Sequence, residues 1–533
     1  PGDEEFLIQL MEGVEDIPGT ALHEGVDWNW ETFPEFLDAI EKKDFVMDLG
    51  FMIGHGPLRS YVMGYERCQS QVDASKEEIS KMSDIVTEAI ESGALGFSTS
   101  RTILHRDVHG VYVPGTEASS EEMKSLAFAI DKAGEGTLEI VSDWLDKEIE
   151  MSWMREYVEK SDCGLTVLQT SGDAVKTILF CEEQFLKGKN VRPQFPGRNV
   201  GMMFGLESSL HPFIGHPSYR EIADLPLSER VQIMKDPAFK EKLLNEKPNF
   251  ASEIEKSMNE QGNTKSQEEI KEAANLGLKL ISNYDTQFIL GDPPNYEPGK
   301  EDSIAALAKS KGIAELEVIY DEFLKNEGTN LVYACFTPYD NHKLDFVERA
   351  YSLKSSVAGG SDGGAHCGLI CDASMPTTNL SHWARDREAG KKIPIELIVR
   401  KQTKDTAETY GLFDRGEIKT GMLADLNIID FEKLNVTHPK MVYDLPLGGR
   451  RLIQTSSGYL ATVKSGEVVY EAGEATGVLP GKLIRGKQTC EVKTEKERVP
   501  FIDRTLRLMS VKAFKLLWNF RKSSVKTTVV SDD

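Results

Sequence analysis

Hydrophobic and polar positions over the first 360 residues alternate between two periods. Short runs rich in β-branched and aromatic residues predict strands at 44–54, 93–100, 137–143, 164–170, 330–336 and 355–362. Longer amphipathic segments between several of these runs predict helices. Ser75 and Glu78 have the spacing of a capping box and predict a helix over 76–92. Ser119 and Glu122 likewise predict a helix over 120–134. Strands that alternate with helices of this length indicate βα units and a parallel sheet.

Two later segments interrupt this alternation. Residues 196–302 predict a long insertion, helical between 226 and 261, because the segment contains Pro212, Pro217, Pro226, Pro237 and Pro248 and the turn-rich GDPPNYEPG. Such an insertion either walls a site or is a surface excursion, and the sequence leaves both interpretations open. After Arg415, short alternating runs with glycine turns predict a small all-β unit.

The end of the chain has a different character. Residues 504–522 contain six basic residues and no acidic ones, with apolar residues near helical spacing. A basic amphipathic helix of this kind can lie on an anionic membrane or dock on an acidic protein surface. Because the rest of the chain is acidic, we favour docking on the chain's own body over membrane binding.

Charge and cysteine usage narrow the classes of partner and compartment. The 533 residues include 62 Lys and Arg against 86 Asp and Glu, a net charge of −24. This balance opposes a phosphate-binding surface, so we expect no nucleic-acid partner. No apolar run approaches the ~20 residues that cross a bilayer. The seven cysteines form no CxxC pair, which predicts buried free thiols and a cytoplasmic location.

Candidate chemistry follows the predicted strands. The segment AGGSDGGAHCG (358–368) places Asp362 and His366 just after a β-rich run. An Asp at a strand end can bind a metal and accept a proton from water, although an Asp flanked by glycine is also a common turn former. The segment GHGPLRSYVMG (54–64) places His55 and Arg59 after another strand.

A third strand is followed by a loop that contains Ser100, Arg101, His105 and Tyr112. His105 and His109 are four residues apart, which suits a metal pair on a helix. Neighbouring Asp, Gly and Pro residues predict a loop instead, so we assign no metal pair there. Arg59 and Arg101 have the planar group that binds a substrate carboxylate, and structural ion pairs are the alternative for both.

Several long segments resemble one known family. The run SDGGAHCGLICDASMPTTNLSHWARDR, then TAETYGLFDRGEIKTGMLADLNIIDFEKL and VKSGEVVYEAGEATGVLPGKLIRG, closely resembles the N-acyl-D-amino-acid deacylase (D-aminoacylase) branch of the amidohydrolase superfamily. The segments PGDEEFLIQLMEGVEDIPGTAL, GHG-x-LR-x-YVMG and GALGFSTSRT resemble the same branch, so the likeness covers about 1–486. It implies a TIM-like (β/α)8 barrel that here lacks its first strands, plus an incomplete small β-sandwich. The corresponding division is 1–414, 415–486 and a tail at 487–533.

The resemblance also implies an activity. Members of this branch are metal-dependent hydrolases of carbon–nitrogen bonds other than peptide bonds, typically the amide of an N-acyl-D-amino acid, with one or two zinc ions. The Asp of the family's eighth strand corresponds to Asp362, as metal ligand and general base. We therefore expect a small-molecule amide as partner, bound by His55, Arg59, Ser100, Arg101, His105, Tyr112 and His366.

This chain departs from the family at several metal-binding positions. The His-x-His pair and the Cys ligand of the family would precede Pro1. The strands that carry metal-binding histidines in the family read VSDWLD (141–146) and VLQTSGD (167–173) here, and no His lies between His109 and His211. We therefore expect the 533-residue chain to bind zinc weakly or not at all. The sequence leaves two main functions open, an amidohydrolase and an incomplete or metal-deficient pseudoenzyme that binds a ligand. An acidic interaction module is a third function.

Overall fold

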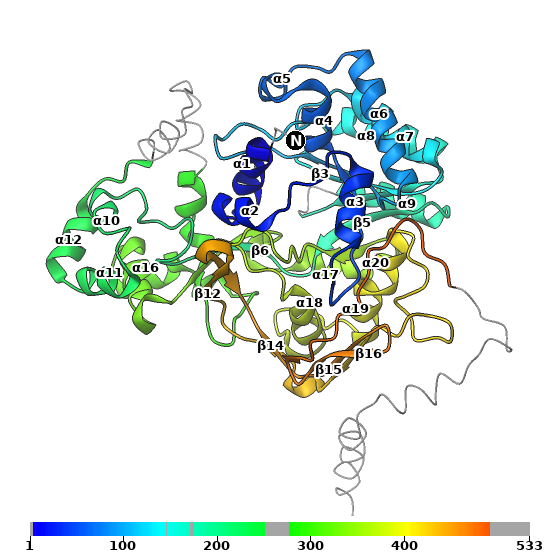
Figure 1. The fold of residues 1–533 in the computed structure, drawn as a ribbon. Helices are drawn as coiled ribbons and strands as arrows, with labels where there is room; N and C mark the ends of the chain where they lie inside the picture. Colours follow the sequence, from blue (N-terminus) through cyan, green and yellow to red (C-terminus); the bar gives the residue numbers. More distant parts are fainter. Residues whose placement is uncertain (1–3, 145, 171–174, 251–276, 491–533) are drawn as a thin grey trace, which may run out of the picture.

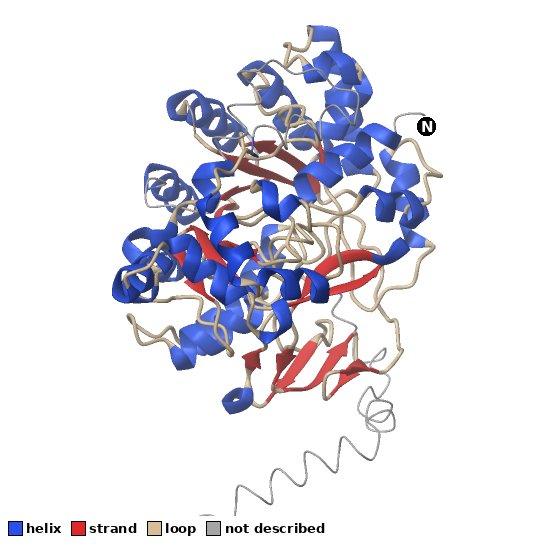
Figure 2. Ribbon diagram, turned by 90° about the vertical axis from the view of Figure 1, so that its left-hand side faces the viewer, coloured by secondary structure: helices blue, strands red, loops and turns tan. Residues whose placement is uncertain are grey.

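A parallel sheet forms the centre of the molecule (Figures 1 and 2). The computed structural model describes residues 4–144, 146–170, 175–250 and 277–490. Within these residues six strands pair in the order β1-β2-β3-β4-β5-β9, and every pair is parallel. Their bounds are Ile53–Gly54, Gly96–Arg101, Thr137–Ser142, Gly164–Leu168, Val191–Pro196 and Val357–Gly359. The βα organisation predicted from the sequence is therefore present.

Helices connect the successive strands. Those between β1 and β5 are α4 (His55–Met63), α5 (Tyr65–Gln69), α6 (Lys76–Glu91), α7 (Ser120–Ala133), α8 (Lys147–Lys160) and α9 (Val175–Leu186). Phe97, Leu138 and Ile140 point from the strands into a core shared with α6, α7 and α8, because alternate strand residues face the helices. Helix α6 begins with the predicted capping box of Ser75 and Glu78. Ser119 caps the N-terminus of α7 as predicted. The Glu122 side chain does not complete the capping box and instead contacts His55.

Several strands differ from the sequence prediction. The predicted strand at 330–336 is β8 (Val332–Thr337), which lies in an antiparallel sheet between β6 (Val200–Phe204) and β7 (Gln287–Ile289) rather than in the parallel sheet. Strand β5 was not predicted because it contains Pro193 and Pro196, which lack the N–H group that a central strand donates. In the sequence, a long excursion over residues 197–356 separates β5 from its partner β9, and it contains β6, β7 and β8.

The excursion carries its own helices. These are α10 (Pro217–Arg220), α11 (Leu227–Met234), α12 (Pro237–Asn245), α15 (Ile304–Lys311) and α16 (Glu315–Phe323). Helices α10, α11, α12 and α16 form the lobe at the left of Figure 1. Phe213 lies in the hydrophobic core of this lobe. It makes edge-to-face contacts with Tyr320 and Phe323 at centroid distances of 5.6 and 5.7 Å. Helices predicted between 226 and 245 are present, and 251–261 lies outside the described residues.

Antiparallel strands follow Arg415, as the sequence predicts. Strands β10 (Leu426–Ile429), β15 (Tyr459–Lys464), β16 (Glu467–Glu471) and β17 (Glu474–Ala475) form one sheet, seen at the bottom of Figure 2. Two ribbons pair β11 (Asn435–Val436) with β14 (Ser456–Ser457) and β12 (Lys440–Leu445) with β13 (Gly449–Ile453). Asp48 ties this part to the start of the chain through Arg415 at 2.7 Å and Lys464 at 3.0 Å. The predicted helix at 504–522 lies outside the described residues.

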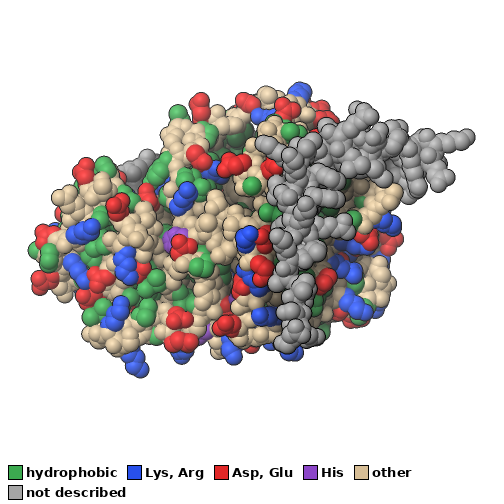
Figure 3. Space-filling model, turned by 90° about the horizontal axis from the view of Figure 1, so that it is seen from below, with side chains coloured by type: hydrophobic (Ala, Val, Ile, Leu, Met, Phe, Trp, Pro, Cys, Tyr) green, Lys and Arg blue, Asp and Glu red, His purple; other side chains and the backbone are tan. Residues whose placement is uncertain are grey.

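The remaining helices precede β1 or follow β8 in the chain. Before β1 come α1 (Glu4–Glu15), α2 (Gly19–Gly25) and α3 (Phe33–Glu41); after β8 come α17 (Asp345–Ser352), α18 (Met375–Thr378), a π-helix (Asn379–Asp386), α19 (Ile395–Gln402) and α20 (Lys404–Thr409). Short 3-10 turns lie at Tyr284–Thr286, Lys300–Asp302, Asn326–Gly328, Asp340–His342, Phe431–Lys433 and Pro446–Gly448. Among the described helices, none is long and apolar enough to cross a membrane. Acidic and basic side chains are interspersed on the face shown in Figure 3.

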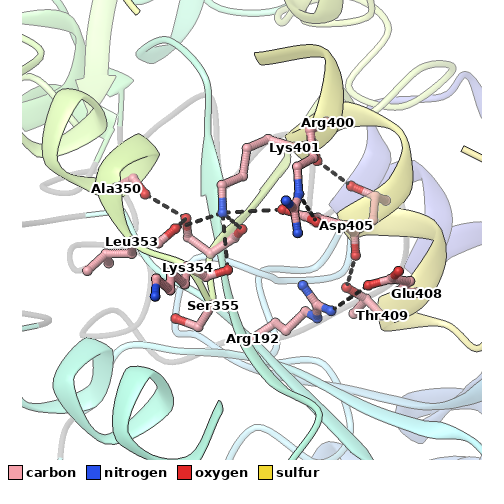
Figure 4. A network of polar contacts seen from close by, with 12 residues as sticks. Arg192, Ala350, Leu353, Lys354, Ser355, Arg400, Lys401, Asp405, Glu408 and Thr409 are labelled. Atoms are coloured by element: carbon pink, nitrogen blue, oxygen red, sulfur yellow. Dashed lines mark hydrogen bonds and ion pairs between the residues drawn. The ribbon is translucent and has the colours of Figure 1, made fainter. Parts of the chain in front are cut away.

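A buried lysine fixes the start of β9 (Figure 4). Lys401 is 2% exposed, and its Nζ donates to the carbonyl oxygens of Leu353 at 2.7 Å and Ser356 at 2.6 Å. Asp405 lies 3.5 Å away and supplies the opposite charge. Burial lowers the pKa of Lys401, although the Asp405 carboxylate acts against this shift. The lysine thus links α19 to the chain that enters the sixth parallel strand.

Candidate active site

The loop after β9 carries Asp362 in an unusual backbone conformation. Asp362 and His366 have φ values of 38° and 52°, and Gly360 and Gly364 have 75° and 97°. This left-handed region is costly for most residues and free for glycine, which accounts for Gly360 and Gly364. The Asp362 side chain is exposed. The loop therefore presents an exposed carboxylate at the carboxyl end of the parallel sheet.

A clamp from the N-terminal helices holds this loop. The N–H of Gly368 donates to Asp16 Oδ2 at 3.1 Å, and Ser209 Oγ donates to the same atom at 2.7 Å. A Cβ atom at Gly368 would lie 2.1 Å from Ser209 Oγ, so a larger residue there would displace the Ser209 hydroxyl. The N–H of Cys367 donates to the carbonyl oxygen of Glu15 at 3.2 Å. Burial raises the pKa of Asp16, against the hydrogen bond from Ser209.

A buried arginine fixes the far end of the same loop. Arg198 follows β5, is 0% exposed, and donates from Nη2 to the carbonyl oxygen of Cys371 at 2.8 Å and to Asp372 Oδ1 at 3.0 Å. Its guanidinium lies 3.6 Å from the ring centroid of Tyr296. Burial raises the pKa of Asp372 to about 6, although the charge of Arg198 acts in the opposite direction. These contacts join the end of β5 to the Asp362 loop.

Ser100 and His105 lie together beside this loop. Ser100 Oγ is 2.8 Å from Nδ1 of His105. Burial lowers the pKa of His105, and the charge of His366 lowers it further, whereas Asp143 and Asp362 raise it. The structure therefore brings Ser100 and His105 into the same electrostatic neighbourhood as Asp362 and His366. Glu15 joins them, with Oε2 3.8 Å from Nε2 of His366.

His55 and Arg59 belong to a different cluster. His55 Nε2 lies 2.9 Å from Glu122 Oε1, and its Nδ1 lies 2.9 Å from Thr99 Oγ1. Arg59 donates from Nε to the same Glu122 oxygen at 2.9 Å. The side chains of His55, Arg59 and Glu122 are at most 2% exposed. They connect α4 and β2 to α7, an arrangement that favours the structural alternative for Arg59 and leaves no ring nitrogen of His55 free.

Arg101 and Tyr112 also have internal partners. Arg101 donates to Glu150 Oε1 at 2.7 Å and to the carbonyl oxygens of Gly115 and Ala118. Tyr112 lies under the guanidinium of Arg106, with 4.3 Å between Cζ and the ring centroid. These contacts shape the loop after β2, and they favour the ion-pair alternative for Arg101.

The side chains at this end of the sheet do not match a metal centre. Among the described residues, no three His, Cys, Asp or Glu side chains come together in a way that could hold a metal ion. His105 points to Ser100, whereas His109 Nε2 lies 3.1 Å from Gln9 Oε1, so the two histidines share no site. The strand ends after β3 and β4 carry Asp143 and Gln169, and the sequence has no histidine between His109 and His211. Within the described ranges, the donor set therefore does not fit zinc.

Some functional contacts were missed from the sequence. Glu15 and Asp16 lie more than 340 residues before the loop they hold, and Arg198 follows a strand that was itself not predicted. No local pattern marks such partners. Glu122 did carry a signal, but its spacing from Ser119 indicated a helix cap rather than a partner for His55.

Comparison with known proteins identifies related sequences. A sequence profile described as the amidohydrolase family matches residues 3–470. An uncharacterized protein of Mycobacterium tuberculosis is 24% identical over 476 residues, 84% of this chain and 72% of the relative. A D-aminoacylase of Alcaligenes xylosoxydans xylosoxydans is 24% identical over 417 residues, 78% of this chain and 67% of that protein.

Solved structures share the fold. A D-aminoacylase studied for its binuclear metal centre superposes with a TM-score of 0.51 at 16% identity, covering 91% of this chain and 86% of that one. A D-aminoacylase mutant solved with copper chloride gives a TM-score of 0.50 at 17% identity, covering 88% and 78%. Together with the parallel sheet, these matches indicate a TIM-barrel-type α/β fold.

Proposed function

The chain belongs to the amidohydrolase family, and from this we propose that it hydrolyses the carbon–nitrogen bond of a small-molecule amide at the loop that carries Asp362. The profile match spans the parallel sheet and that loop. Membership confirms the resemblance noted in SDGGAHCG and the neighbouring segments, and it assigns an enzyme of the amidohydrolase type.

One observation carries the proposal. Asp362 presents an exposed carboxylate at the carboxyl end of β9, on a loop held by Asp16 and Arg198. Parallel α/β folds place their active sites at this end of the strands. Amide hydrolysis requires a group that accepts a proton from the attacking nucleophile, and a fixed carboxylate can do so. We assign that role to Asp362.

The substrate class rests on the relatives. The similarity to D-aminoacylases supports the amide of an N-acyl-D-amino acid, whose carboxylate needs a cation. Arg59 and Arg101 already bind Glu122 and Glu150. Arg450 is a better candidate, because its Nη2 lies 3.3 Å from Ser209 Oγ beside the clamp.

The test is hydrolysis of a panel of N-acyl-D- and N-acyl-L-amino acids by the purified 533-residue chain, followed by release of the free amine. We expect turnover of at least one D-enantiomer. Asp362→Asn should lower turnover at least about 100-fold, because it removes the proton acceptor and nearly keeps the shape. Asp84→Asn is the matched control and should leave turnover unchanged. Asp84 is an exposed residue of α6 that pairs with Lys132. Unaltered turnover in Asp362→Asn would overturn the assignment.

A binding protein is the second candidate function. The described donor set, which lacks a three-ligand metal group, favours it. In that case no amide of the panel would be cleaved, whereas N-acyl-amino acids would still raise the melting temperature of the chain. Thermal unfolding with and without each amide separates the two functions.

Two further expectations remain proposals. The seven cysteines are all free, which supports a cytoplasmic location. The division of the chain near Arg415 is supported by the change from parallel to antiparallel strands.

A further inference from the structure

A cavity lies at the amino end of the parallel sheet, opposite to the loop that follows β9. Its volume is about 580 Å³, which is in the range of small-molecule sites. Residues at the starts of β2, β3, β4 and β5 line it, namely Leu95, Thr137, Gly164 and Asn190. The end of α20 and the segment around Gly486 complete its wall. The sheet therefore separates this cavity from the carboxylate of Asp362.

A buried arginine on the cavity wall has an unused donor. Arg192 is 5% exposed and donates from Nε to Asn190 Oδ1 at 3.1 Å. Its Nη2 donates to Glu408 Oε2 at 3.2 Å (Figure 4). Its Nη1 is buried and has no hydrogen-bond partner among the described residues. Burial lowers the pKa of Arg192, although Asp405 and Glu408 act in the opposite direction. An anionic ligand group would supply the charge and the acceptor that these neighbours do not fully provide.

Two further charged side chains of the cavity are unpaired. Lys487 and Glu135 both line it, and neither forms an ion pair with a described residue. They lie on the same part of the wall, because a Cβ atom at Gly486, the neighbour of Lys487 in the chain, would be 2.8 Å from Glu135 Oε1. In contrast, Lys189 and Asp162 of the same wall pair with each other at 2.8 Å. The cavity therefore offers a cation and a carboxylate for the charges of a ligand.

Aromatic rings support both cations. Phe185 lies under the guanidinium of Arg192, with 4.8 Å between Cζ and the ring centroid, and Phe413 lies 5.3 Å from Nζ of Lys487. Both rings line the cavity, and Leu95 adds an aliphatic surface. A ligand that matches this wall combines charged groups with an apolar part.

We propose that this cavity binds a free α-amino acid with an apolar side chain. Arg192 and Lys487 hold its carboxylate, Glu135 holds its ammonium group, and Phe185 and Phe413 contact its side chain. A simple anion would leave Glu135 without a counter-charge, whereas a simple amine would leave the donors of Arg192 and Lys487 unused. Because the cavity lies at the opposite end of the sheet from the loop after β9, the amino acid and an amide substrate can bind at the same time.

Calorimetric titration of the 533-residue chain with leucine tests the proposal. We expect one leucine to bind in the cavity. Isocaproate has the same skeleton without the ammonium group, and isoamylamine has it without the carboxylate. Each should bind at least about 10-fold more weakly than leucine, because each loses charge-assisted contacts.

Substitutions assign the binding to this cavity. Lys487→Gln and Glu135→Gln should each weaken leucine binding at least about 10-fold. Lys482→Gln is the matched control and should bind leucine normally, since Lys482 is an exposed lysine of the same segment that does not line the cavity. Asp362→Asn should also leave the leucine affinity unchanged, which separates this site from binding at the loop after β9. Thermal unfolding of each variant shows whether it is folded.

The outcomes separate this site from the proposed function. Absence of leucine binding, or equal binding by the parental chain, Lys487→Gln and Glu135→Gln, would overturn the site. Binding of isocaproate as tight as that of leucine would overturn the amino-acid assignment in favour of a simple anion. Amide turnover by a chain that does not bind leucine would reject the site and leave the proposed function intact. Leucine binding that depends on Lys487, without turnover of any amide, would sustain the site and reject the proposed function.

Discussion

Nε2 of His55 lies 2.9 Å from Glu122 Oε1, in a cluster that is cut off from solvent between β2 and α7. Nδ1 of the same ring lies 2.9 Å from Thr99 Oγ1. The geometry is that of a neutral imidazole that donates to a carboxylate and accepts from a hydroxyl. Arg59 then supplies the positive charge that balances Glu122.

Removing Glu122 should therefore be costly. Glu122→Ala leaves the Arg59 guanidinium buried without its counter-charge and His55 without its acceptor. We expect a loss of about 3–5 kcal/mol in the free energy of unfolding. Glu183→Ala, which removes an exposed partner of Lys187, should change it far less. Denaturant titration of both variants measures the difference, and equal losses would contradict the buried role.

The same cluster predicts sensitivity to acid. Burial lowers the pKa of His55 below its usual 6.5. Burial alone would raise the pKa of Glu122, but His55 and Arg59 outweigh it and hold that pKa below 4.5. Both groups bind more protons when unfolded, so their contribution is complete above pH 6.5 and is lost as the pH falls through the folded values.

The acid effect can be assigned to His55 by substitution. Between pH 6.5 and 5.5, His55→Gln should reduce the dependence of the unfolding free energy on pH by up to about 1 kcal/mol per pH unit. His23→Gln, which changes an exposed histidine paired with Glu5, should keep the parental slope. Unfolding curves at three pH values are sufficient, and an unchanged slope in His55→Gln would refute the buried neutral ring.

Lys401 should be as important as Glu122 for stability. Lys401→Met leaves the carbonyl oxygens of Leu353 and Ser356 and the carboxylate of Asp405 without their cation. We expect a loss of about 3–5 kcal/mol in the free energy of unfolding. Lys404→Met removes the neighbouring surface pair with Glu417 and serves as the control. Comparable stability of the two variants would argue against a pinning role for Lys401.

Asp16 should control the order of the Asp362 loop. Asp16→Ala removes the acceptor of the Gly368 N–H, so amide hydrogen exchange at residues 366–369 should accelerate. Asp16→Asn retains one carbonyl oxygen and should have a smaller effect. Asp27→Ala, an exposed partner of Lys43, should leave exchange in this loop unchanged. Protection of Gly368 that survives Asp16→Ala would show that the clamp lies elsewhere.

Metal content gives a prediction independent of activity. The described residues offer no group of three metal ligands, so we expect less than one equivalent of zinc in the purified 533-residue chain after dialysis. Chelation should leave the melting temperature unchanged. Stoichiometric zinc that survives mild chelation would show that the chain assembles a site from residues outside the described part.

The sequence predicted elements with strong local signals. Strands β2, β3 and β4, the start of α7 and the capping box of α6 follow from periodicity and spacing. Strand β5 could not be predicted from periodicity because its prolines obscure the strand pattern. The antiparallel position of β8 could not be predicted because only long-range pairing decides it. At the site, Ser100, His105, Asp362 and His366 were named from their positions after strands. Their partners Asp16 and Arg198 could not be, since those contacts depend on how distant segments pack.

The pairing of β5 with β9 has a consequence for synthesis on the ribosome. Pro196 leaves β5 long before Val357 begins the strand that covers its edge. At 5–20 residues per second, the ribosome needs roughly 10–30 s to make the intervening chain. Throughout that interval β5 has an open edge, which can pair with strands of other chains. The nascent chain should therefore depend on chaperones most between the emergence of β5 and that of β9.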